Sequence, residues 1–179
     1  MDNEAYNKLI TNNHLSGLLG QELIRDDLLP SILGSDYHEI SYWAGKHLAR
    51  THQLANYDDL TTFFDQFKMG HLTLLKRSGN QIKWQLDGDV VTNRLDLFDD
   101  PDFFLEAGFI AQNCQTILNR QAESEIEKTN PSKGFVLITT FISKDKPIEG
   151  SNSTQPFKII NPSQQNSDSE RSEQISSFN

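Results

Sequence analysis

Residues 36–50, Asp36-Tyr37-His38-Glu39-Ile40-Ser41-Tyr42-Trp43-Ala44-Gly45-Lys46-His47-Leu48-Ala49-Arg50, combine a helix start with a dense set of apolar residues. Asp36 and Glu39 have the spacing of a capping box at a helix N-terminus. One set of positions recurs at i, i+3, i+4, i+7 and i+8, which is one side of a helix: Ile40, Trp43, Ala44, His47 and Leu48. We therefore predict an amphipathic helix that buries this face and leaves Lys46 and Arg50 on the solvated side.

The chain before this stretch divides into an arm and a helix. Residues 1–13 are polar and without a pattern, so we predict a flexible N-terminal arm there. From Leu15 to Ile32, leucines and isoleucines recur as an apolar stripe. This stripe predicts a helix that bends or ends before Pro30, because proline removes a backbone donor and clashes with the preceding turn.

The chain after the stretch changes from helical to strand periodicity and back. A helix is predicted from Asp58, as N-cap, to Gly70. Apolar and polar side chains then alternate on both sides of residues 78–80, which predicts a β-hairpin. Residues 90–98 fit either a short helix or an extended connector. Residues 99–102 are a helix-start signal, and the long helix that follows is predicted to fade into Glu123–Lys128 and to end at Asn130-Pro131.

Residues 134–142 are short, β-branched and apolar on both faces, which favours a central strand. We predict a single α+β domain at residues 14–143. It has N-terminal helices, an antiparallel sheet from the hairpin plus this C-terminal strand, and one long helix packed on the sheet. Residues 144–179 are rich in Ser, Asn, Gln and Pro and are predicted to be a disordered polar tail. Within the tail, Phe157-Lys158-Ile159-Ile160 is an apolar island, either a docking motif or an unstructured accident.

Composition indicates a cytoplasmic protein and argues against several partners. At 179 residues the chain is long enough to bury a core, and its single cysteine excludes an internal disulfide and a multi-cysteine zinc site. No run approaches the roughly 18 apolar residues of a membrane span, so stable membrane insertion is not expected. The net charge of −9 repels phosphate backbones, so nucleic acid is not an expected partner.

The sequence shows no catalytic or metal-binding constellation, so we expect a non-enzymatic protein without cofactor or metal. The local signatures of Ser and Cys nucleophiles are absent, and the five histidines lack metal-ligand spacing. Cys114 lies on the apolar face of the long helix, where a thiol behaves as a small buried hydrophobe. A lipid-modified or reactive cysteine is the alternative.

Two segments resemble the YslB family of small bacterial proteins, a domain of unknown function. They are Tyr42-Trp43-Ala44-Gly45-Lys46-His47-Leu48-Ala49-Arg50 and Leu105-Glu106-Ala107-Gly108-Phe109-Ile110-Ala111. The resemblance covers about residues 15–143. The family is similar in fold to a ligand-binding superfamily that includes vinyl-reductase-type domains, haem–nitric-oxide sensor domains and TRAPP subunits. The resemblance therefore implies a TRAPP-like fold, while fold analogy alone does not transfer function.

Candidate site residues come from the same two segments. Gly45 and Gly108 lie inside predicted helices, each near an aromatic residue, which indicates either a helix contact or the floor of a cavity. In the cavity interpretation, the ligand-binding residues are Trp43, His47, Gly108 and Phe109. Arg50 and Glu106 are candidates for a buried polar link between the two helices, and Glu106 as a surface acid is the alternative.

Two functions remain open from these residues. The first is a non-enzymatic binding module for an apolar small molecule. The second is a protein–protein adaptor or homodimeric scaffold, which would use a second apolar strip on the long helix and exposed aromatic residues such as Tyr37 and Tyr42. A haem or gas sensor with His47 as the iron ligand is implied only by the remote superfamily.

Overall fold

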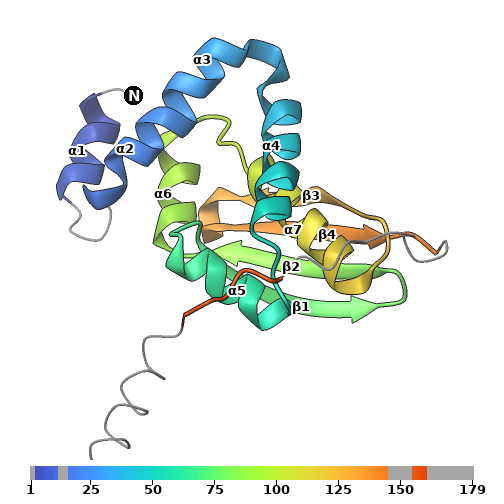
Figure 1. Cartoon of the computed structure of the whole chain (residues 1–179). Coiled ribbons are helices and arrows are strands. Elements are labelled where there is room, and N and C mark those ends of the chain that lie inside the picture. The colour runs from blue at the N-terminus through green and yellow to red at the C-terminus, as the bar shows by residue number, and fades with distance from the viewer. Residues whose placement is uncertain (1–2, 12–15, 145–154, 161–179) are drawn as a thin grey trace, which may run out of the picture.

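A four-stranded antiparallel sheet forms the base of the protein, with strands in the order β1-β2-β4-β3. The computed structural model describes residues 3–11, 16–144 and 155–160. The strands are β1 (His71–Ser78), β2 (Gln81–Asp87), β3 (Ala122–Asn130) and β4 (Phe135–Ile142). Helices α5 (Tyr57–Gln66) and α7 (Phe104–Leu118) lie across one face of the sheet, as Figure 1 shows. The predicted α+β architecture is therefore confirmed.

The predicted hairpin and central strand are also confirmed. β1 and β2 are joined at Gly79 and Asn80, and β2 pairs with β4 so that Trp84 lies opposite Ile138. Residues 90–98, for which a short helix and an extended connector were both predicted as alternatives, form helix α6 (Asp89–Leu97). Helix α5 begins two residues earlier than predicted, because Asn56, and not Asp58, is the N-cap and accepts a hydrogen bond from the amide of Asp59.

Strand β3 replaces what was predicted as the end of the long helix. Asn119 adopts a left-handed conformation (φ 51°, ψ 40°) and stops α7 at Leu118. The next residues alternate between the two faces of the sheet, with Ala122 and Ser124 buried and Glu123 and Glu125 exposed. The prediction was wrong because glutamates are poor strand formers, yet they suit the solvated side of an edge strand.

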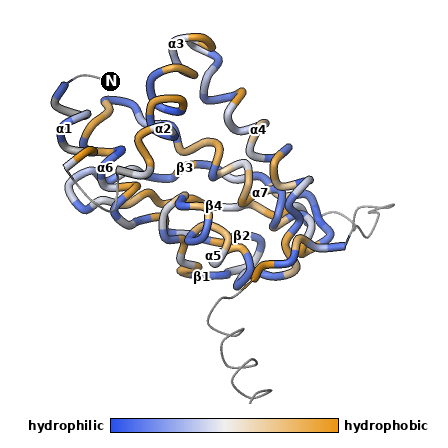
Figure 2. The backbone as a smooth tube through the Cα atoms, turned by 60° about the vertical axis from the view of Figure 1, so that its left-hand side comes forward, coloured by the Kyte–Doolittle hydropathy of each residue, from blue (hydrophilic) through white to orange (hydrophobic). Residues whose placement is uncertain are grey.

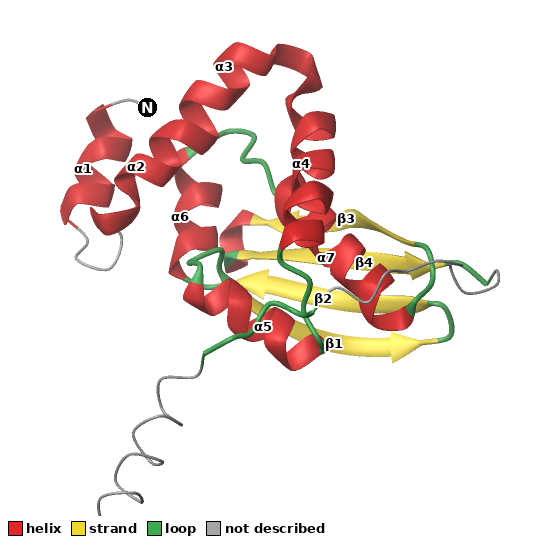
Figure 3. Cartoon of the chain, viewed as in Figure 1, coloured by secondary structure: helices red, strands yellow, loops and turns green. Residues whose placement is uncertain are grey.

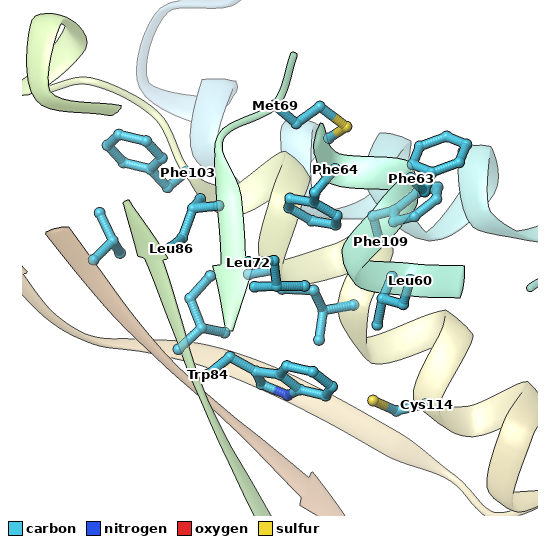
Figure 4. Close-up of a cluster of buried hydrophobic side chains, with 14 of the residues drawn as sticks. Leu60, Phe63, Phe64, Met69, Leu72, Trp84, Leu86, Phe103, Phe109 and Cys114 are labelled. Atoms are coloured by element: carbon cyan, nitrogen blue, oxygen red, sulfur yellow. The ribbon is translucent and has the colours of Figure 1, made fainter. Parts of the chain in front are cut away.

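The core lies between the sheet and the helices that cross it, and it is rich in aromatic side chains (Figure 4). Trp84 is fully buried, and its indole nitrogen donates to Thr140 Oγ1 at 3.1 Å. The ring of Phe63 stacks on that of Phe109 from α7 with centroids 4.7 Å apart. Cys114 is fully buried in this core, as predicted. Such a core fixes the relative positions of α5 and α7, and both help to form the pocket described below.

The N-terminal helices stand away from the sheet (Figure 3). Helix α1 (Asn3–Thr11) falls within the segment predicted as a flexible arm. A short turn η1 (Ser16–Leu18) leads into a continuous helical path of α2 (Leu19–Glu22), the π-helical turn η2 (Leu23–Leu28) and α3 (Leu29–Leu33). Pro30 does not end this path. The wider π turn precedes it, and the amide of Leu29 donates to Ile24 O five residues back.

The C-terminal tail is described only at residues 155–160, which run beside α5 (orange-red in Figure 1). The remaining parts of the tail predicted to be disordered, residues 145–154 and 161–179, lie outside the described residues. In the described part of the chain, none of the helices is long and apolar enough to cross a membrane.

Candidate ligand-binding pocket

Helices α4 (Tyr37–Thr51) and α7 meet backbone to backbone at the two glycines noted in the sequence. A Cβ atom built on Gly45 would lie 2.1 Å from Leu105 O, and one on Gly108 would lie 2.0 Å from Tyr42 O. Real Cβ atoms do not approach other atoms so closely. The glycines therefore mark a helix contact, and there is no room at them for a ligand.

The four predicted ligand-binding residues are not brought together. Trp43 is 53% exposed and His47 is also exposed on the outer side of α4, whereas Gly108 and Phe109 are buried in α7. The predicted buried face of α4 was wrong, because close packing against α7 requires small residues, and these lie on the opposite face from Trp43. Surface placement of His47 also removes the basis for a haem ligand inside a cavity.

Lys46, predicted to be solvated, is instead buried beside the edge of the sheet. It is 3% exposed, and its Nζ donates to Glu123 Oε1 at 2.7 Å. The hydroxyl of Tyr42 donates to Glu123 Oε2 at 2.5 Å and accepts from the amide of Ser124. These contacts connect α4 to β3. Helix α4 is therefore held by polar contacts with the sheet and by its glycine contact with α7.

The predicted polar link between Arg50 and Glu106 does not form. Arg50 is exposed and donates to Gln112, while Glu106 is fully buried and is neither a surface acid nor a partner of Arg50. Glu106 forms an ion pair and hydrogen bond with Arg25 from the π turn, and its other carboxylate oxygen lies 3.7 Å from Arg94 on α6. The buried link therefore joins α7 to the N-terminal helices.

A cluster of charged residues attaches the N-terminal helices to the body of the domain. Arg94 binds Asp26 through two hydrogen bonds of 2.7 and 2.8 Å, and it also donates to the carbonyl of Asp102. The hydroxyl of Tyr37 donates to Arg25 O at 2.5 Å. Buried ion pairs of this kind cost several kcal/mol when one partner is removed, because the other charge stays buried.

Glu22 is the acid in this cluster with the most distant cation partner. Its side chain is 4% exposed, and its nearest cation is Arg94 at 3.6 Å, beyond hydrogen-bond distance. Burial, with the neighbouring Asp26 carboxyl as a second cause, raises the pKa of Glu22 to about 8. Glu22 is therefore largely a neutral acid at pH 7 and is able to share its proton with Asp26, one helical turn away.

An apolar pocket of about 330 Å³ lies between the N-terminal helices, the end of α4, α5 and the start of α7. Its polar and charged lining residues are Gln21, Arg25 and His52. The remaining lining side chains are apolar and come from four separate stretches of the chain: Ile24, Leu29, Leu48, Phe63, Phe67, Met69 and Leu105. The pocket is thus an apolar cavity beside the buried charged cluster, and Arg25 belongs to both.

One wall of the pocket is a stack of aromatic rings. Phe67 stacks on Phe63 with centroids 4.0 Å apart, and Phe63 stacks in turn on the buried Phe109. The ring of His52 stands edge-on to Phe63 at 6.0 Å, and its Nδ1 is 3.0 Å from Leu48 O at the end of α4. Phe67 is the C-cap of α5 and follows Phe63 by four residues, so both rings lie on the same side of the helix.

The sequence analysis did not select Phe63 and Phe67 as site residues, although their spacing of four is typical of one side of a helix. The structure divides them, because Phe63 is 1% exposed and Phe67 is 47% exposed. The signal available in the sequence was Phe67 itself, an aromatic residue at the end of the apolar stripe of the helix. The contribution of Ile24 and Leu29 depends on how the N-terminal helices dock, and no local pattern encodes that.

Other reactive groups lie away from this pocket. Burial raises the pKa of the Cys114 thiol to about 12, so the thiol is a packing group and a poor nucleophile. His38 lies 3.1 Å from Asp102 Oδ1 and 3.0 Å from Asp100 Oδ2, near the start of α7. Among the described residues, no group of three or more His, Cys, Asp or Glu side chains is placed to hold a metal ion.

The antiparallel sheet and the helices that cover it form a fold that is also found in other proteins. The structure of a vinyl-4-reductase family protein from Methanocaldococcus jannaschii is similar, with a TM-score of 0.50 and 15% identity, over 76% of this chain and 91% of that chain. The phenol-responsive sensory domain of the transcription activator PoxR, solved with phenol, gives a TM-score of 0.50 and 11% identity over 69% and 73% of the two chains. The fold implied by the resemblance to vinyl-reductase-type domains is thereby confirmed.

Comparison of sequences assigns the chain to a protein family. Residues 18–140 match the family described as "Protein of unknown function (DUF2507)". YslB of Bacillus subtilis (strain 168) is 38% identical over 124 residues, which are 69% of this chain and 84% of that protein. The protein belongs to the DUF2507 family, and the predicted relationship to YslB is confirmed.

Proposed function

We propose that this protein is a non-enzymatic binding module that holds a small apolar molecule in the pocket between η2, α4 and α5. The observation that carries the proposal is the pocket itself, which combines a volume of about 330 Å³ with a lining dominated by apolar side chains. Ligand sites in proteins have this character, with volumes of roughly 300–1,000 Å³ and few polar groups. The residues differ from those predicted from the sequence, but the class of ligand is the same.

The size of the pocket limits the ligand. A cavity of about 150 Å³ is enough to hold benzene. The present volume of about 330 Å³ therefore suits a molecule of about two rings, or a short alkyl chain of similar bulk. The stacked rings of Phe63 and Phe67 favour an aromatic ligand, since aromatic pairs add to area burial. Phenol bound to the structurally similar PoxR domain supports a small aromatic ligand in a fold of this class.

The chemistry of the lining supports binding without reaction. Among the described residues that line the pocket, Arg25 and His52 are the ionisable ones, and Arg25 is occupied by Glu106. A reaction by acid–base or nucleophilic catalysis needs several groups in defined roles around one reacting atom. His52 at the rim offers the ligand one polar contact, which is a binding role.

Fluorescence titration with 1-naphthylamine, an uncharged aromatic probe of two fused rings, tests this proposal. The expected result is saturable binding to the wild type and weakened binding to Leu48→Trp, which fills the pocket from α4. The matched control is Leu75→Trp, which adds the same side chain at a position on β1 that is 49% exposed and outside the pocket. Equal binding by all three proteins would show that the probe binds elsewhere.

A second candidate function, self-association, is favoured by the exposed residues of the N-terminal helices. Their outer side and that of α4 carry large apolar side chains that are 43–67% exposed: Leu23, Leu28, Ile32, Ile40 and Trp43. Figure 2 shows apolar residues recurring along α3 and α4, away from the sheet. Contiguous exposed apolar surface is typical of protein interfaces. Sedimentation of the wild type and Ile32→Glu tests this, and a wild-type monomer at high concentration would contradict it.

A further inference from the structure

The short segment Gln155–Ile160 is attached to the domain although the chain around it is polar. The amide of Phe157 donates to Gln53 O at 2.6 Å, just after the end of α4. At the other end of the segment, Gln66 Nε2 donates to Ile160 O at 2.8 Å, at the end of α5. The backbone of the segment is therefore held at Phe157 by a backbone–backbone hydrogen bond and at Ile160 by the side chain of Gln66.

Two side chains of this segment, Phe157 and Ile159, contact the domain, although Phe157 is 37% exposed. The ring of Phe157 lies edge-on to His52, with centroids 5.1 Å apart, and 6.1 Å from Phe63. Ile159 is partly buried and packs on the hydrophobic core. Lys158 and Ile160, between and after them, are exposed. The apolar island noted in the sequence thus has the pattern of a docking motif.

The surface that receives Phe157 is also a wall of the pocket. His52, Phe63 and Phe67 line the pocket, and all three rings contact Phe157. The pocket keeps its volume of about 330 Å³ with the segment in place, and Phe157 is not among its lining residues. The segment therefore supports the wall from outside and does not occupy the space of a ligand.

We propose that His52, Phe63 and Phe67 form a docking site for an extended aromatic segment, that residues 155–160 of the same chain occupy it, and that this docking strengthens ligand binding in the adjoining pocket. The effect on the ligand rests on the proposed function, whereas the docking itself does not. Linkage between two binding events is reciprocal, so if docking strengthens ligand binding, the ligand strengthens docking by the same factor. Tethering keeps the local concentration of the segment high, so docking does not require tight intrinsic affinity.

Phe157→Ala in the full chain tests both parts, with Lys158→Ala as the matched control because Lys158 is exposed. Hydrogen exchange of the backbone amide of residue 157, which donates to Gln53 O, is measured without ligand and is expected to be slow in the wild type and in Lys158→Ala and fast in Phe157→Ala. Equally fast exchange in all three proteins would overturn the docking. This readout is independent of any ligand.

Titration of the same three proteins with 1-naphthylamine tests the linkage. Phe157→Ala is expected to bind the probe about fivefold or more weakly, within the usual range of coupling between sites, and Lys158→Ala as tightly as the wild type. Equal or tighter binding by Phe157→Ala, with its segment released, would overturn the linkage. A wild type that binds no probe contradicts the proposed function and the linkage together, while the exchange result still decides the docking.

Discussion

At the scale of single residues, glycines set how closely α4 and α7 approach. Added Cβ atoms at Gly45 and Gly108 would collide with backbone carbonyl oxygens of the facing helix, which cannot move without shifting that helix. Tight backbone packing of this kind leaves the large residues of α4, such as Trp43, on the outside. The same contact positions Leu48 and Leu105, which line the pocket from the two helices.

Gly108→Ala is therefore expected to destabilise the protein. Inserting even one methyl group into a fully packed contact costs about 1–3 kcal/mol, and a backbone collision places this change at the upper end or above it. The measurement is the free energy of unfolding in urea. Gly20→Ala is the control, because Gly20 lies in helix α2 with no described atom within 4 Å of an added Cβ, and alanine there favours the helix. Similar stability of the two variants would contradict the helix contact.

Individual residues also show where sequence reasoning reached its limit. The helical period correctly located α4, but it selected the face with the largest side chains, whereas the buried face consists of small and polar residues such as Ser41 and Ala49. Glu106 was recognised as a member of a polar link, but its partner Arg25 is 81 positions earlier in the chain. A periodic pattern reports only local geometry, so it identifies the group and not its long-range partner.

At the scale of elements, the N-terminal helices are attached by charge and leave apolar residues outside. Arg25, Asp26 and Glu22 face the domain, and Leu23 and Leu28 face solvent. Five-residue spacing between these two leucines matches the wider π turn in which they lie, so both point outward. Attachment through ionisable groups makes the stability of this region sensitive to pH.

The raised pKa of Glu22 determines whether the stability rises or falls with pH. Its pKa is raised from 4.5 to about 8 in the folded protein, so between these values the folded state binds more protons than the unfolded state. The contribution of Glu22 is fully present below pH 4.5 and is lost as pH rises through about 8. We expect the free energy of unfolding of the wild type to fall relative to that of Glu22→Gln as the pH is raised from about 5 to about 8.5. Parallel pH profiles for the two proteins would show that Glu22 is not buried as described.

Elements also differed in how well the sequence predicted them. The hairpin and β4 have strict alternation or β-branched runs, and both were predicted. β3 was missed because half of its residues are charged or polar side chains that face water at the sheet edge. Edge strands need little intrinsic strand preference, since pairing with β4 and burial of Ala122 and Ser124 hold β3 in place.

At the scale of the whole molecule, the candidate site exists only after the chain has folded. Fold class and family were predicted from two motifs and the order of elements. The pocket is assembled from η2, α3, α4, α5 and α7, and its lining residues look like ordinary core residues when each helix is considered alone. For this reason the sequence analysis selected the motif residues Trp43 and His47, which are not among the residues that line the pocket.

The central claim is that the pocket holds an apolar molecule, and native mass spectrometry of the protein purified from its own host tests it most directly. Wild type and Leu48→Trp would be measured under native and denaturing settings. We predict extra mass on the wild type under native settings, its loss on denaturation, and its absence from Leu48→Trp. The same extra mass on both proteins, or a bare wild type under native settings, would contradict the account.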